Sequence, residues 1–116
     1  MNKAYLEKFY NGDTQHTAEI FEIFLTHTVH QIPELRKHME NGDWEATRRT
    51  AHRIKPNFLM VGLTDLEKKV MTIEKMADHN EDTKTLMQLL EDVEKKVEEA
   101  IPVLKKELQK MNLSNA

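Results

Sequence analysis

Residues 43–62 have the sequence DWEATRRTAHRIKPNFLMVG. Apolar and small side chains recur in this segment at steps of three and four, which is the period of one face of an α-helix. Asp43 can cap the first turn with its carboxylate, and Gly62 suits the left-handed residue that ends a helix. We therefore expect a helix over residues 44–61 whose inward stripe consists of Trp44, Thr47, Ala51, Ile54, Phe58 and Val61.

Two helices are expected before this segment. A short leading helix is indicated by the apolar residues Tyr5, Leu6 and Phe9. Asn11 and Gly12 close it, and Asp13 can cap a long helix over residues 14–40. Pro33 should bend the long helix because it removes a backbone donor. The inward face of this helix is expected to hold Phe21, Phe24, Leu25, Thr28, Ile32, Leu35 and Met39.

Two further helices are expected after the segment. The first should begin with a capping box between Thr64 and Glu67 and bury Leu66, Val70, Ile73 and Ala77. A turn over residues 78–81 leads to a last helix over about 82–110, in which Pro102 is a candidate kink. The stripe of the last helix is Leu86, Leu89, Val93, Val97, Ile101, Leu104 and Leu108. Residues 113–116 are expected to form a frayed tail.

Composition narrows the class of protein. The 116 residues suit a single domain, which we place at residues 1–112, and 39% hydrophobic with 32% charged residues suit one helical core under a solvated surface. The absence of cysteine removes disulfides and fits a cytoplasmic location. The net charge of -3 argues against general nucleic-acid binding, and no apolar run is long enough for membrane insertion. We expect an all-α antiparallel four-helix bundle with a short leading N-terminal helix.

The six histidines invite a search for a metal site. No Glu-x-x-His pair of the di-iron bundles and no His-Glu-x-x-His motif occurs. His27 and His30 lie one turn apart and remain a metal candidate, but an exposed polar helix face is the reading that we favour. No glycine-rich phosphate loop is present either, so we expect no cofactor of the chain's own.

His52 differs from the other histidines in its surroundings. On a helix its face is shared by Arg48, Arg49, Lys55, Pro56 and Leu59, roughly opposite Ile54, so His52 should be exposed. The cations should keep the imidazole neutral, and a neutral ring nitrogen is a nucleophile. Lys55, one turn on, can place an ammonium beside an anion attached to His52. Ordinary solvated surface is the alternative that spacing alone leaves open.

The segment Ala51-His52-Arg53-Ile54-Lys55, with Gly62 ten residues after the histidine, resembles the phosphorylation segment of histidine phosphotransfer domains. In that family an aliphatic residue, a lysine and often a glycine follow the histidine at two, three and four positions. Two departures stand out. Pro56 replaces the usual glycine, and Leu59 stands where a small residue is common. The expected order of helices is also similar to that family.

The resemblance implies a phosphoryl carrier and not a kinase. His52 would reversibly accept a phosphoryl group from the aspartate of a response-regulator receiver domain, and Lys55 would stabilise it. Mg²⁺ is expected on the receiver. The expected contact surface for the partner is Arg48, Arg49, Pro56, Leu59 and Met60, although a core position for Met60 stays open. A hybrid sensor kinase is a second candidate partner, and we expect a monomer. The alternative is a non-catalytic helical adaptor that retains the fold, which the departures at Pro56 and Leu59 favour.

Overall fold

The computed structural model describes residues 1–79 and 82–115, with every side chain in these ranges except that of Phe9. Part of the expected turn over residues 78–81 therefore lies outside the described residues. In chain order the elements are α1 (Lys3–Tyr10), α2 (Thr14–Ile23), the π-helical segment η1 (Phe24–Thr28), α3 (Val29–Glu40), α4 (Trp44–Met60), α5 (Thr64–Asp78) and α6 (Thr83–Asn115). No strand occurs in the described ranges, and the all-α prediction is confirmed.

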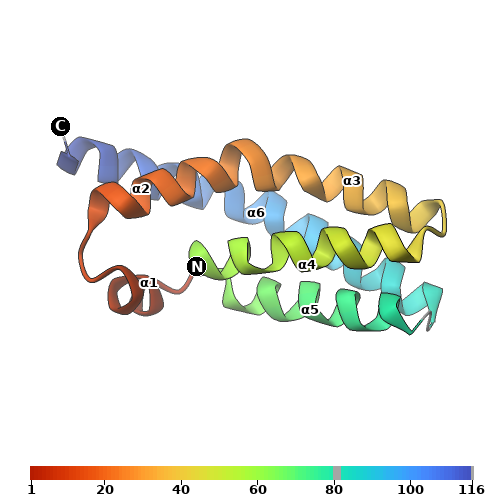
Figure 1. Cartoon of the computed structure of the whole chain (residues 1–116). Helices are drawn as coiled ribbons and strands as arrows, with labels where there is room; N and C mark the ends of the chain where they lie inside the picture. Colours follow the sequence, from red (N-terminus) through yellow and green to blue (C-terminus); the bar gives the residue numbers. More distant parts are fainter. Residues whose placement is uncertain (80–81, 116) are drawn as a thin grey trace.

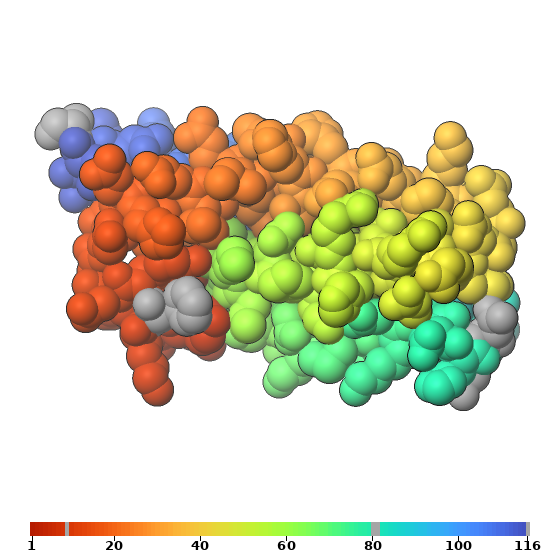
Figure 2. Space-filling view, viewed as in Figure 1, coloured from red at the N-terminus to blue at the C-terminus, as the bar shows by residue number. Residues whose placement is uncertain are grey.

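The helices form an elongated antiparallel bundle of 47 × 22 × 19 Å. Successive segments α2–η1–α3 make one long column, α4 returns beside it, α5 runs back along α4, and α6 spans the length of the bundle (Figure 1). The leading helix α1 lies at the end of the bundle where α4 stops (Figure 1). One face of α4 remains on the surface between the α2–α3 column and α5 (Figure 2).

The predicted inward stripes make up most of the core. Thr47, Ala51, Ile54, Phe58 and Val61 are all buried, and Trp44 is half-buried. Close packing of aromatic rings joins the columns, since the rings of Phe24 and Phe58 meet edge to face at 5.4 Å between centroids. In α6 the buried set includes Leu90, whereas Leu89 of the predicted stripe is only half-buried.

The long second helix is irregular at a position that the sequence did not predict. The helical geometry changes at η1, ahead of Pro33, and α3 continues through Pro33 without interruption. A π-helical turn inserts an extra residue between the backbone hydrogen bonds of the helix, so the side chains that follow it are rotated around the helix axis. Thr28, the last residue of η1, is buried and accepts a hydrogen bond at its Oγ1 from Nδ2 of Asn57 on α4, 3.1 Å away. The irregular turn thus lies against the helix that carries His52.

The expected capping box at the start of α5 is wrong. Thr64 is already the first helical residue, and Leu63 occupies the capping position without a side-chain hydrogen bond. The helix begins one residue early because the chain leaves α4 through Gly62, at φ 76°, and buries Leu63 directly afterwards. The caps expected at Asp13 and Asp43 are confirmed, since their carboxylates accept from His16 N and Ala46 N.

The last helix is longer than predicted. It continues through Pro102 and past Lys110 to Asn115, so the expected frayed tail is helical over residues 113–115. Ala116 lies outside the described residues. This extension carries few buried groups, and Leu113 is 72% exposed, which explains why hydrophobic periodicity did not reveal it.

Candidate functional site

The candidate nucleophile, His52, lies at the middle of α4. Ala51 and Ile54, its neighbours along the helix, are fully buried and fix the helix against the core. The side chain of His52 points the other way and is 68% exposed, as the helical period predicts. A histidine on a packed helix with an open ring is accessible to another protein without any rearrangement of the bundle.

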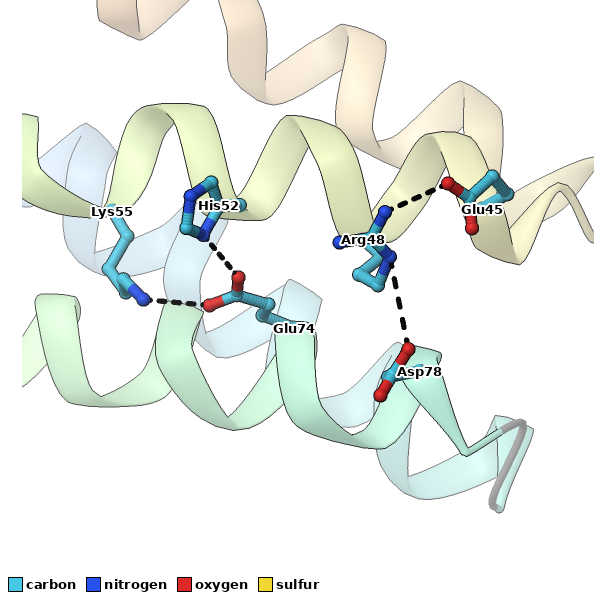
Figure 3. Close-up of polar contacts among 6 residues, drawn as sticks. All are labelled: Glu45, Arg48, His52, Lys55, Glu74 and Asp78. Carbon is cyan, nitrogen blue, oxygen red and sulfur yellow. Dashed lines mark hydrogen bonds and ion pairs between the residues drawn. The ribbon is translucent and has the colours of Figure 1, made fainter.

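Glu74, which sequence reasoning missed, contacts the ring of His52. Its Oε2 lies 2.6 Å from Nδ1 of His52, and its Oε1 lies 2.8 Å from Nζ of Lys55 (Figure 3). The Glu74 side chain comes from α5 and is 15% exposed. One carboxylate therefore bridges the two residues that the sequence placed at the site.

The contact determines which ring nitrogen is available. An ionised carboxylate is only an acceptor, so Nδ1 of His52 donates its hydrogen to Glu74. In the neutral ring the lone pair then belongs to Nε2, which has no hydrogen-bond partner among the described residues. The exposed nitrogen of His52 is thus the nucleophilic one.

The ionised state of Glu74 follows from its neighbours. Burial alone favours the neutral carboxyl, but hydrogen bonds from Lys55 and His52 outweigh it and hold the pKa of Glu74 below its usual value. Lys55 lies beside His52 as predicted, with its side chain 25% exposed. Its ammonium is already held by Glu74 and is not directed freely at solvent.

The predicted charged neighbours of His52 were all cations, and this prediction omitted an acidic partner. The group in contact with its ring is a carboxylate, and Arg48 is directed away to Glu45 at 2.8 Å and toward Asp78 at 3.9 Å (Figure 3). Arg49 is exposed and forms no ion pair within the described part of the chain. The spacing rule placed the cations on one face correctly, but only the packing of α5 on α4 introduces the acidic partners.

The remaining predicted surface residues lie toward the C-terminal end of α4. Pro56 is exposed and does not interrupt the helix, and Leu59 is half-buried. Met60 is 38% exposed, which resolves the open question of a core position in favour of the surface. Beside it lies Ile23 of α2, 51% exposed, and both line a shallow hollow of about 30 Å³ together with Ile20, Phe24, Thr28 and Asn57.

Gly62 of the motif has a structural role at the junction with α1. Its φ is 76°, and a Cβ there would lie 3.0 Å from Cγ of Leu6 and 3.1 Å from the carbonyl oxygen of Asn2. The Asn2 N–H donates to the Gly62 carbonyl at 2.8 Å. Glycine is therefore required both by the left-handed turn and by the close approach of the N-terminal segment.

Two other expectations concern metals and membranes. No cluster of three or more histidine or carboxylate side chains with metal-binding geometry is found in residues 1–79 and 82–115. His27 instead contacts the hydroxyl of Thr26, 3.1 Å from its Nδ1. Among the described helices, none combines the length and the apolar character that crossing a membrane requires.

Comparison with known proteins identifies the family of the chain. The family model described as Hpt domain matches residues 19–112, which include η1 and the complete α3, α4 and α5. The chain therefore belongs to the Hpt, or histidine phosphotransfer, family. Domains of this family are phosphoryl carriers of two-component phosphorelays, not kinases, and they interact with response regulators and kinases. No curated protein and no solved structure matches the chain.

Proposed function

We propose that this protein carries a phosphoryl group on Nε2 of His52 and exchanges it with the aspartate of response-regulator receiver domains. The observation that supports this assignment is the exposed ring of His52, whose Nδ1 is tied to Glu74 while Nε2 is open. The fixed tautomer presents the lone pair outward from a rigid helix, which is the arrangement that nucleophilic attack requires.

The forward step conserves atoms and charge. The lone pair of His52 Nε2 attacks the phosphorus of the receiver's aspartyl phosphate, and the P–O bond to the aspartate breaks. The aspartate leaves as a carboxylate, and the phosphorylated ring becomes a cation that keeps its hydrogen on Nδ1. Mg²⁺ in this proposal is held by the acidic pocket of the receiver, and the chain supplies no metal ligand.

Lys55 is the proposed stabiliser of the phosphoryl oxygens. Lys55 lies one helical turn after His52, and its ammonium is 2.8 Å from Glu74, the carboxylate that also contacts the ring of His52. A positioned ammonium lowers the energy of the negative charge that develops on a transferring phosphoryl group. Lys55 acts on rate in this proposal, while His52 forms the bond.

The proposed docking surface combines the exposed face of α4 with the neighbouring end of α2. Arg49 can attract the acidic receiver pocket, and Pro56 and Leu59 lie next to the histidine on the helix face. Met60 and Ile23 add exposed apolar area. Arg48 contributes less than Arg49, because Glu45 and Asp78 already neutralise much of its charge.

A direct experiment tests the assignment and the adaptor alternative together. Receiver domains of the source organism, charged with a ³²P-labelled phosphodonor, are mixed with the wild-type protein, with His52→Gln and with His30→Gln as a control. His30 is an exposed histidine on α3. We expect an acid-labile, alkali-stable label on the wild type and on His30→Gln, and none on folded His52→Gln. A wild-type protein that binds receivers without gaining label would instead identify an adaptor.

A further inference from the structure

Glu74 contacts the ring on the side away from the proposed phosphoryl group. Attack by Nε2 requires only the tautomer that this contact selects, and any neutral acceptor would select the same one. A half-buried ionised carboxylate supplies more than a neutral acceptor, since it also stabilises a positive charge on the ring. The charge of Glu74 therefore points to a role in the state that carries a positive ring, which is the phosphorylated one.

We propose that the charge of Glu74 maintains the phosphorylated ring as an effective donor, by retaining the hydrogen on Nδ1 of His52. This inference rests on the proposed phosphoacceptor role of His52. It assigns Glu74 as a positioning residue for the return step, in which the phosphoryl group leaves the carrier.

The chemistry of the return step makes this hydrogen decisive. An acceptor oxygen, from an aspartate carboxylate or from water, attacks the phosphorus, and the P–Nε2 bond breaks with its electron pair going to the nitrogen. If Nδ1 carries hydrogen, the leaving group is neutral imidazole. If Nδ1 has lost its hydrogen to solvent, the leaving group is an imidazolate anion, which is a far stronger base and leaves much more slowly.

The charged groups around the ring act in opposite directions. Glu74 and the phosphoryl oxygens favour the positive ring, whereas the ammonium of Lys55 disfavours it. Arg48 lies one turn before His52 on α4, but its guanidinium is paired with Glu45 and Asp78. Glu74 is in direct contact at 2.6 Å and largely buried, so its influence exceeds that of the more distant exposed charges.

The α3 side of α4 adds little to this balance. Between α3 and α4, within the described residues, Arg53 and Glu34 form an ion pair at 3.8 Å, and both side chains are more than half exposed. Solvent screens such a pair strongly. The charge of the ring is therefore governed by the α5 side, where Glu74 stands.

Glu74→Gln removes the charge and keeps the shape and an acceptor oxygen. Asp92→Asn is the matched control, because Asp92 also holds a lysine of α5, Lys69, at 2.7 Å, but lies on α6 away from His52. Each variant is phosphorylated with phosphoramidate, a small donor that needs no partner protein. The loss of the phosphoryl group to water, and its transfer to receiver domains, are then measured from pH 5 to pH 10.

For Glu74→Gln we expect label on His52. At alkaline pH the rate at which the variant loses or transfers its phosphoryl group should be about tenfold lower than in the wild type, because a hydrogen bond to a neutral amide is weaker than one to a carboxylate. The two proteins should differ least at acidic pH, where the ring keeps its hydrogen on Nδ1 in both. Asp92→Asn should follow the wild type. A Glu74→Gln profile identical to the wild-type profile would overturn this inference while leaving His52 as the carrier, whereas absence of label on His52 in the wild type would overturn the proposed function itself.

A measurement on the wild type alone keeps the inference testable if Glu74→Gln does not fold. The ¹⁵N chemical shifts of the His52 ring in the phosphorylated protein report directly whether Nδ1 carries hydrogen. We expect Nδ1 to retain its hydrogen under alkaline conditions in which phosphohistidine in an unfolded peptide has lost it. Equal titration in the folded protein and in the peptide would exclude a contribution from Glu74.

Discussion

The hydroxyl of Tyr10 donates a hydrogen bond to the backbone carbonyl of Met60, 2.7 Å away. This bond joins α1 to the last turn of α4, the helix that carries His52. Met60 would otherwise leave a helix-terminal carbonyl without an internal donor. Together with the contact between Leu6 and Gly62, it makes the N-terminal helix a brace for the end of α4. The brace lies outside the matched residues 19–112.

Replacement of Tyr10 by phenylalanine should remove this bond and keep the packing. We expect a loss of about 1 kcal/mol in the free energy of unfolding, the usual net value of one partly buried hydrogen bond. Urea denaturation at pH 7 measures the change. An unchanged midpoint would show that the bond does not brace α4.

The ionisation of Tyr10 should also make the stability of the protein depend on pH in the alkaline range. Burial, with a smaller contribution from Tyr5, raises the pKa of Tyr10 above its usual 10.0. A raised folded-state pKa means that the unfolded state loses its proton first, so stability is present below about pH 10 and falls as the pH rises through the folded pKa. The wild type should therefore lose stability more steeply above pH 10 than Tyr10→Phe. Parallel curves for the two proteins would contradict this origin.

Gly62→Ala should destabilise the protein more than Gly42→Ala. Both glycines have positive φ, of 76° and 68°, so each substitution pays the cost of a left-handed alanine, about 1 kcal/mol. Only at Gly62 would the new Cβ also press on Leu6 and Asn2, at 3.0 and 3.1 Å, whereas nothing lies within 4 Å at Gly42. Thermal unfolding of the two variants measures the difference. Equal losses of stability would mean that α1 shifts to make room for the new Cβ at no free-energy cost.

Lys55→Ala should slow transfer without abolishing it. Removal of one positioned charge from a transferring phosphoryl group lowers rates by about 10- to 1,000-fold. Single-turnover transfer from a phosphorylated receiver is the measurement, with Lys69→Ala as the control, since Lys69 pairs with Asp92 at a distance from the site. A wild-type rate in Lys55→Ala would remove this residue from the proposed machinery.

Ile23→Ser should weaken docking and leave the chemistry intact. Ile23 is 51% exposed beside Met60, and loss of its apolar area should raise the KM for a phosphorylated receiver about three- to tenfold with little change in kcat. Val103→Ser is the control, because Val103 is 48% exposed on α6, outside the proposed docking surface. If both variants have the same KM, receivers do not contact the end of α2 that carries Ile23.

Periodicity was sufficient for the fold because each helix buries a stripe of its own. The burial of Phe58, the exposure of His52 and the caps at Asp13 and Asp43 all follow from a period of 3.6 residues and from local hydrogen bonding. The same rule failed where no burial marks the helix, as in the last turns of α6, and at Thr64, where the exit of the chain from α4 moved the start of α5.

The sequence alone determined the bundle, the exposed face of α4 and the position of Lys55 beside His52, because all of these depend on neighbours within one helix. Only the tertiary structure brought Glu74 to Nδ1 of His52, 22 positions away in the chain, and turned Arg48 toward Asp78. Glu74 adjoins the buried stripe of α5, but the rotation and register of α5 against α4 decide which residue it meets. Those are set by the packing of two helices, and no pattern within either helix specifies them.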